Sequence, residues 1–260
     1  MSEIKEVVWD SIDENGNPIN PRVATPEELA AKQAKEDSQR PSPSNPNPTP
    51  KAEPIHMQVD MIKDGDGKSL MSPVRLTDGM IHWNDPRLRT PPKLWDFKQP
   101  VEEAAKLGLL LIKVAVKLGG AGLSANQLGI DSKVFALTVI QNHHYAVFNP
   151  EILESSEETV LIEEGCLSRP GLWLRISRPK SIKVKYFTFK GDEVITEYDG
   201  YLSRVFQHEY DHMLGIDFTQ RVSKMKLDMA LKKVDKKIKK AMSTKQFDYE
   251  GRVRPVIIAE

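Results

Sequence analysis

The chain has very little cysteine and no excess of charge, and each of these facts excludes a class of protein. Its 260 residues contain one cysteine, Cys166, so no intramolecular disulfide can form and a small secreted scaffold held by disulfides is excluded. The 37 basic and 37 acidic residues give a formal net charge of zero, which provides no overall attraction to DNA or to an acidic membrane surface. The role of the single cysteine is therefore the first question that the sequence raises.

Long apolar runs are also missing. The longest, residues 107–118, is interrupted by Lys113 and Lys117 and is shorter than the ~20 apolar residues that a membrane-spanning helix needs. The first residues are acidic and show no basic stretch followed by an apolar one, which argues against a secretory signal or a transit peptide. We therefore expect a cytoplasmic protein with no membrane partner, in a compartment that keeps a free thiol reduced.

Residues 1–58 differ in composition from the rest of the chain. They hold 10 acidic and 6 basic residues and half of the 18 prolines, so their net charge is negative. The run at residues 40–54 has few apolar side chains, and its prolines lack backbone donors, as is typical of an extended, unpacked segment. We interpret residues 1–58 as a disordered extension in which residues 26–37, with Thr25 as N-cap, have the pattern of a short helix. The alternative is a docking arm, for instance for a proline-recognition module.

The rest of the chain combines helical and strand patterns. Apolar residues recur at helical spacing over residues 101–118, 200–214 and 222–242. Strand-like patterns occur at residues 133–140, 144–148, 181–189 and 193–198. The last two are separated by a Lys-Gly-Asp turn, which predicts a hairpin. We predict an α+β catalytic domain over residues 59–242, followed by a tail over residues 243–260.

One helical segment contains the sequence HEYDH at residues 208–212. Histidines at positions i and i+4 project from one face of a helix about 6 Å apart, which suits two ligands of one metal ion. Glu209 would lie on the flank of the same helix, within reach of a water bound to that ion. Because HExxH also occurs by chance, two incidental histidines remain an alternative at this point.

The single cysteine offers a third ligand, which a catalytic divalent ion needs beside an open position for water. Cys166 lies in the sequence EGCLS at residues 164–168. A lone buried cysteine usually only fills space. Here the neighbouring glycine, serine and proline indicate a turn and not a strand interior, which favours a ligand. Gly165 would also let a bound molecule approach the backbone closely.

A third cluster, GAGLSANQ at residues 120–127, follows the first predicted helix. Its glycines could simply end that helix, and a phosphate-binding loop is poorly supported because no Lys-Ser/Thr pair follows them. Taken in order and spacing, GAGLSANQ, EGCLS and QHEYDH (residues 207–212) resemble the three signature motifs of the peptide deformylases. The resemblance extends from about residue 85 to residue 218. It implies antiparallel sheets around a central HExxH helix, with a further helix at the C-terminal end.

The resemblance implies a metal-dependent hydrolase that removes the formyl group from the N-terminal formyl-methionine of nascent polypeptides. Cys166, His208 and His212 would then bind one divalent metal ion, with water as the fourth ligand. The family favours Fe(II), and the same ligands also suit Zn(II), Ni(II) or Co(II). Without the cysteine, HExxH alone would equally permit a zincin-type endopeptidase. A non-catalytic binding protein with the same fold is a further alternative, although the ligands and Glu209 are intact.

The resemblance also implies roles around the metal. Glu209 would act as general base and then as general acid. The Gln127 side-chain amide and the Leu167 backbone N–H would stabilise the oxyanion. Asp211 would either orient a histidine ligand or be an ordinary polar helix residue.

Substrate contacts are expected on both sides of the metal. Backbone groups near Gly122 and Gly165 would bind the extended peptide like an added strand. Val205, one turn before His208, is a candidate wall of an apolar pocket for the methionine side chain.

Three residues near the predicted site depart from the family pattern. Ser124 stands where the family usually has alanine. Arg169 and Trp173 stand near the substrate rim, where the family often has smaller or aliphatic residues. The sequence assigns no role to the additional hydroxyl, and it leaves the effect of all three on substrate preference open.

The last predicted helix carries eight lysines between residues 224 and 240. Its apolar stripe consists of Leu227, Leu231, Val234 and Ile238. Such a helix is usually a solvated cover of the core. In some deformylases the C-terminal basic helix docks on the ribosome, so a salt-sensitive ribosome contact through residues 224–242 is the alternative.

Overall fold

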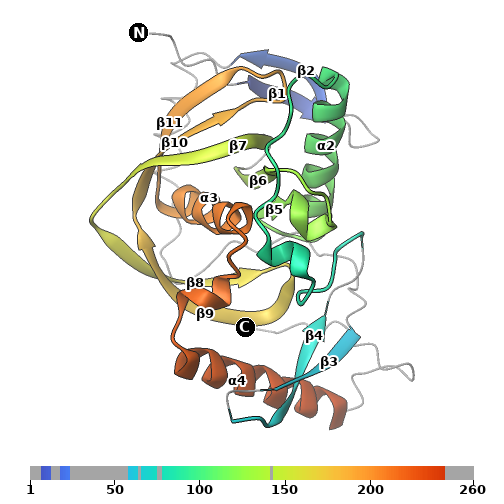
Figure 1. Cartoon of the computed structure of the whole chain (residues 1–260), viewed down its shortest axis with the longest axis vertical. Coiled ribbons are helices and arrows are strands. Elements are labelled where there is room, and N and C mark those ends of the chain that lie inside the picture. Colours follow the sequence, from blue (N-terminus) through green and yellow to red (C-terminus); the bar gives the residue numbers. More distant parts are fainter. Residues whose placement is uncertain are drawn as a thin grey trace.

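The centre of the molecule is a five-stranded antiparallel sheet with the strand order β11-β10-β7-β6-β5 (Figure 1). The structure, a computed structural model, describes residues 7–12, 18–23, 58–63, 66–74, 78–140 and 143–243. The strands of the central sheet are β5 (Gly122–Ser124), β6 (Val134–Ile140), β7 (His143–Ser155), β10 (Ser181–Phe187) and β11 (Glu193–Asp199). The predicted hairpin is confirmed, because β10 and β11 pair antiparallel along their whole length. The strand predicted at residues 144–148 is longer than expected and continues past Pro150.

Helices cover both faces of this sheet. They are α2 (Val101–Lys117) and α3 (Gly200–Met213). Along β6, Val134 and Ala136 pack into the core beneath α2, whereas Phe135 and Leu137 pack into the core beneath α3. Alternate residues of a strand point to opposite faces, so both faces of β6 are buried. This explains why β6 has a nearly continuous apolar sequence.

A second antiparallel sheet consists of β8 (Thr159–Cys166) and β9 (Arg169–Pro179). Helix α3 lies between this pair and the central sheet (Figure 1). The sequence analysis did not predict either strand and placed Cys166 in a turn. Cys166 is instead the last residue of β8, and it pairs with Arg169 across a turn formed by Leu167 and Ser168. Apolar residues at exposed positions (Leu161 and Trp173) and charged residues at buried ones (Glu164 and Arg178) break the alternation that would have predicted these strands.

The C-terminal helix α4 (Lys224–Ser243) lies at the end of the molecule beyond β8 and β9 (Figure 1). It packs beside a hairpin of β3 (Gln58–Lys63) and β4 (Ser69–Val74) (Figure 1). Leu231, Val234 and Ile238 of α4 share a buried cluster with Leu70 of β4 and Ile176 of β9. The predicted helix and its apolar stripe are therefore confirmed. The predicted helices at residues 101–118 and 200–214 are likewise confirmed as α2 and α3.

The N-terminal region differs from the expectation of a disordered extension over residues 1–58. Residues of β1 (Val7–Ile12) and β2 (Pro18–Val23) pair as an antiparallel hairpin. Both segments contain valine and isoleucine, which favour strands. The helix predicted at residues 26–37, the proline-rich run at residues 40–54 and residues 244–260 of the predicted tail lie outside the described residues.

Short 3₁₀ helices complete the described elements. They are η1 (Pro86–Arg89), η2 (Ala125–Leu128) and η3 (Phe218–Arg221). Within the described ranges, no helix is long and apolar enough to span a membrane.

Candidate active site

Helix α3 carries the two histidines. Asp199 caps its N-terminus by accepting a hydrogen bond from the Gly200 N–H. After its C-terminus, Gly215 has a φ of +70°, and a Cβ added there would lie 2.7 Å from the carbonyl group of Arg89. Between these ends, the His208 and His212 rings are buried and their centroids lie 5.4 Å apart.

Cys166 completes a three-residue cluster with these histidines. One ligand atom from each of Cys166, His208 and His212 lies within 4.8 Å of the other two, and the Cys166 Sγ is 3.4 Å from the His212 Nε2. The end of β8 and the middle of α3 therefore meet at one point. Two imidazoles and one thiolate suit Zn(II), Fe(II), Co(II) or Ni(II).

The charge state of the cysteine also fits a metal ligand. Burial opposes ionisation of the thiol, but His212 and His208 outweigh it and lower the pKa of Cys166 to about 5. Because the thiolate is the form that binds metals, the environment of Cys166 stabilises the binding form.

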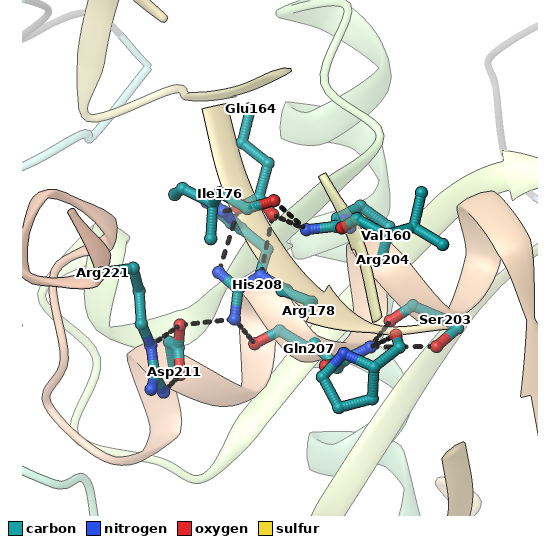
Figure 2. Close-up of polar contacts among 11 residues, drawn as sticks. Val160, Glu164, Ile176, Arg178, Ser203, Arg204, Gln207, His208, Asp211 and Arg221 are labelled. Carbon is teal, nitrogen blue, oxygen red and sulfur yellow. Dashed lines mark hydrogen bonds and ion pairs between the residues drawn. The ribbon is translucent and has the colours of Figure 1, made fainter. Parts of the chain in front are cut away.

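The orientation of His208 is set by a carboxylate from β8. The His208 Nδ1–H donates to the Glu164 Oε2 at 3.1 Å, so the Nε2 is left to face the cluster (Figure 2). Burial opposes ionisation of Glu164, but His208 and Arg178 hold the pKa of this carboxyl well below its usual range. A carboxylate that holds the second ring nitrogen is the common support of a histidine metal ligand.

Glu164 belongs to a buried ionic network (Figure 2). Arg178 donates from its Nε and Nη2 to the two Glu164 oxygens at 2.7 and 2.9 Å, and from its Nη1 to the Asp211 Oδ2 at 2.8 Å. Arg204 also donates to Glu164, and Arg221 donates to Asp211. Asp211 therefore bonds to arginines and not to a histidine ring. The carboxylate that orients a histidine ring is Glu164.

Glu209 is buried beside the cluster, and its Oε2 has no hydrogen-bond partner within the described part of the chain. Burial raises the pKa of Glu209 to about 7, although His208 and His212 act in the opposite direction. The first motif lies against this side chain, because a Cβ added to Gly122 would be 2.6 Å from the Glu209 Oε1. An unpartnered carboxylate oxygen at this place can accept a proton from a water molecule.

Gln127 of η2 also reaches the cluster. Its Nε2 donates to the Ser168 Oγ at 3.0 Å and lies 3.5 Å from the Cys166 Sγ. Its Oε1 accepts from both the N–H and the hydroxyl of Ser124. The three sequence motifs, which are far apart along the chain, therefore converge on one buried site.

Known proteins share this arrangement of motifs. Residues 78–228, more than half of the chain, match the family model described as polypeptide deformylase. The chain belongs to the polypeptide deformylase family. The match includes the central sheet, β8, β9 and α3, whereas β1 to β4 and most of α4 lie outside it.

Individual deformylases give the same result. The peptide deformylase of Thermotoga maritima is 44% identical over 124 residues, which are 48% of this chain and 75% of the relative. That of Treponema pallidum is 41% identical over 146 residues, which are 55% of this chain and 90% of the relative. A crystal structure of a peptide deformylase from Synechococcus elongatus in complex with actinonin has a TM-score of 0.55 and 29% identity. The structural match covers 68% of this chain and 90% of the Synechococcus chain.

The deformylase resemblance also assigns roles to Leu167, Gly165 and Val205, and each lies in a different environment. Leu167 packs against Gly120, where a Cβ would lie 2.6 Å from the Leu167 Cδ1. The Trp173 ring covers Gly165, with ring atoms 3.2 Å from a Cβ added there. Val205 is buried in the core between α3 and the central sheet.

Arg169 anchors the strand that follows the turn. Its Nε and Nη2 donate to the Asp217 Oδ2 at 3.1 and 2.9 Å, and its guanidinium lies 4.0 Å from the centre of the Trp83 ring. Arg169 therefore connects the turn after Cys166 to η3 and to the loop before η1. Trp173 is about half exposed, whereas Arg169 is mostly buried.

Sequence reasoning missed two supports of the deformylase site. Glu164 stands inside the EGCLS motif, two residues before Cys166, and this closeness was a usable signal. Arg178 lies at the far end of β9 and carries no local signal, because its contacts with Glu164 and Asp211 depend on the fold.

Proposed function

We propose that Cys166, His208 and His212 bind the catalytic metal of a peptide deformylase, and that Glu209 performs the proton transfers. The family to which the chain belongs removes the formyl group from the N-terminal formyl-methionine of nascent polypeptides. The observation that carries the assignment is the three-residue cluster with an unpartnered Glu209 oxygen beside it.

Proton transfer follows from the position of Glu209. When bound, a divalent ion supplies a Lewis acid that lowers the pKa of water and polarises the formyl carbonyl. Glu209 accepts a proton from the attacking water and passes it to the departing amine. Its burial keeps competing water away from the carboxyl group.

The negative charge that develops on the formyl oxygen needs hydrogen-bond donors. The Gln127 Nε2 and the Leu167 N–H supply them in our proposal, and the closeness of Gln127 to Cys166 supports the first assignment. Removal of one such donor in other enzymes costs about 3 kcal/mol of transition-state stabilisation.

Peptide binding between β5 and β8 is supported by the strand arrangement. In the sheets that the structure describes, β5 lies at one edge of the central sheet, and β8 pairs only with β9. An extended peptide can add to such free edges through backbone hydrogen bonds, with Gly122 and Gly165 as contact points. Val205 remains our proposed wall of the methionine pocket.

The activity is tested by amine release from formyl-Met-Ala-Ser. Protein loaded anaerobically with Fe(II), Ni(II) or Co(II) should release the amine, and no release with any of them would reject the function. Glu209→Gln should retain the metal and lose turnover, while Glu163→Gln, at an exposed position of β8, serves as the matched control. Turnover by Glu209→Gln would remove Glu209 from its role.

The metal in the cell is proposed to be Fe(II), by resemblance to the family. The ligand set itself also accommodates Zn(II), Ni(II) and Co(II). Elemental analysis after anaerobic purification is the decisive measurement. A stoichiometric content of zinc and no iron would contradict the proposal.

We also propose that α4 contacts the ribosome and that the enzyme acts in the cytoplasm. All eight lysines of α4 are exposed, whereas Leu231, Val234 and Ile238 of its apolar stripe are buried. Binding to ribosomal RNA through these lysines should weaken as salt rises.

Substitution tests this contact better than deletion, because removing α4 would expose the core. Lys226→Gln, Lys233→Gln and Lys237→Gln together should reduce co-sedimentation with ribosomes at low salt. The matched control changes three exposed lysines around α2, at the other end of the molecule: Lys98, Lys106 and Lys113. Equal sedimentation of both triple variants would contradict the proposal.

A further inference from the structure

The hydroxyl of Ser124 is buried at the end of β5, with no exposed surface. A buried hydroxyl is costly unless it forms a hydrogen bond. Ser124 donates this bond to the Gln127 Oε1 at 3.0 Å, and its backbone N–H donates to the same oxygen at 2.9 Å. A single residue therefore supplies two donors to one acceptor of the neighbouring glutamine.

Two donors on the Oε1 determine which way the Gln127 amide faces. The Nε2 must then point away from Ser124, toward the Ser168 Oγ at 3.0 Å and the Cys166 Sγ at 3.5 Å. A flipped amide would place its NH₂ group against the Ser124 N–H, which cannot accept a hydrogen bond. The hydroxyl adds a second bond and restricts the tilt of the amide.

We infer that Ser124 is a positioning residue that holds the Gln127 amide in its catalytic direction. The inference rests on the proposed function, in which Gln127 stabilises the oxyanion. An alanine at this position would keep the backbone donor and lose the hydroxyl. The amide would then vary more in orientation. This would weaken its hydrogen bond to the oxyanion in the transition state.

The kinetic consequence is a lower kcat with little change in KM, because the interaction is used in the transition state. Ser124→Ala should lower kcat about three- to tenfold, the range for one lost hydrogen bond, with KM within about twofold. In a Gln127→Ala background, Ser124→Ala should cause no further loss of kcat. An unchanged kcat, or a full additional loss in that background, would overturn the inference.

Ser203 provides a matched control. It is also fully buried, and its hydroxyl accepts from a glutamine side chain, the Gln207 Nε2, at 3.0 Å. Ser203→Ala should therefore lose a comparable hydrogen bond and keep kcat within about twofold of the parent. If Ser203→Ala lowers kcat as much as Ser124→Ala does, the effect is a general one of buried hydroxyls and the inference is wrong.

A measurement without turnover separates this inference from the proposed function. In nitrogen-15 spectra, the side-chain NH₂ signals of Gln127 are identified by their loss in Gln127→Glu. Their hydrogen exchange should be at least about threefold faster in Ser124→Ala, because one of the two bonds to the amide oxygen is lost and the amide is held less firmly. Ser203→Ala should leave these signals unchanged.

The activity measurement and the exchange measurement can contradict the two proposals separately. Faster exchange in protein that shows no deformylase activity would reject the function and retain the positioning role. Normal deformylase activity with unchanged exchange and unchanged kcat in Ser124→Ala would reject the positioning role alone.

Discussion

The two histidines of the metal cluster are held in opposite ways. The His208 ring donates to a buried carboxylate that is itself bonded to two arginines. The His212 Nδ1 has no hydrogen-bond partner among the described residues, and its region is held by the neutral amide of Asn126, which donates to the His212 carbonyl at 2.9 Å. One side of the centre depends on charge and the other on neutral contacts.

This difference predicts where the centre is sensitive to substitution. A buried ion pair costs a great deal when one partner is removed, because the other charge stays buried and unpaired. A neutral hydrogen bond costs about 1 kcal/mol when it is lost. We therefore expect the charged side to govern both folding stability and metal affinity, and the neutral side to contribute little to either.

Loss of the Glu164 carboxylate should have the largest effect. Glu164→Ala leaves Arg178 and Arg204 without their buried partner, so we expect a loss of about 3–5 kcal/mol in the free energy of unfolding. The His208 ring also loses its support, which should weaken metal affinity by about 10- to 100-fold. Denaturant unfolding and metal competition with a chelator measure the two effects.

The neighbouring residue Glu163 is the control for this prediction. It has the same side chain on the exposed face of β8, and Glu163→Ala should change the free energy of unfolding by less than about 0.5 kcal/mol. Metal affinity that is equal in Glu164→Ala and in the parent would show that the carboxylate does not orient His208.

A smaller effect is expected from the other carboxylate of the network. Asp211→Asn removes the charge that faces Arg178 and Arg221, and should cost about 1.5–3 kcal/mol of folding free energy. Because Asp211 bonds to no ligand ring in the described structure, metal affinity should change by less than about threefold. A loss of affinity as large as that of Glu164→Ala would mean that the whole network, and not Glu164 alone, supports the metal.

The sequence predicted the three residues that cluster better than the residues that support them. The histidines follow a local spacing on one helix, and Cys166 is unique in the chain, so both can be recognised without the fold. Arg178 approaches Glu164 only because β8 and β9 pair, and these strands were not predicted. Leu161 and Trp173 are exposed, whereas Glu164 and Arg178 are buried, so the alternation that predicts a strand is broken in both.

Elements with a local sequence pattern were predicted, whereas features that depend on the fold were not. The helices α2, α3 and α4 follow apolar periodicity, and the β10–β11 hairpin follows its turn residues, so these elements were predicted. The role of Ser124 could not be, because it depends on the conformation of the Gln127 side chain. In the N-terminal region, the proline-rich composition obscured the strand-forming residues of β1 and β2.

A substitution on the neutral side tests the comparison directly. Asn126→Ala removes the hydrogen bond to the His212 carbonyl and should cost about 1 kcal/mol in the free energy of unfolding. Metal affinity should stay within about threefold, since this amide bonds to the backbone carbonyl of His212 and not to its ring. The same unfolding and competition measurements apply, and an affinity loss matching Glu164→Ala would abolish the distinction between the two sides.

The ion pair between Arg169 and Asp217, just outside the centre, stabilises the fold in a pH-dependent way. Burial raises the pKa of Asp217, but Arg169 and the Thr219 backbone N–H outweigh it and lower the pKa below its ordinary value. The pair therefore stabilises the fold above the unfolded-state pKa of about 4, and this contribution is lost as pH falls through the lowered folded-state pKa. Arg169→Ala should cost about 1–2 kcal/mol at pH 7.

Two contacts of Arg169 respond differently to pH, which allows them to be separated. Protonation of Asp217 removes the ion pair, whereas the stacking of Arg169 on Trp83 does not depend on pH. The difference in unfolding free energy between the parent and Arg169→Ala should begin to shrink as pH falls below about 4, without vanishing. Asp217→Asn should remove the pH-dependent part and leave the remainder. A difference that stays constant from pH 7 to pH 3 would assign the stability to stacking alone, and charge would then matter only inside the metal centre.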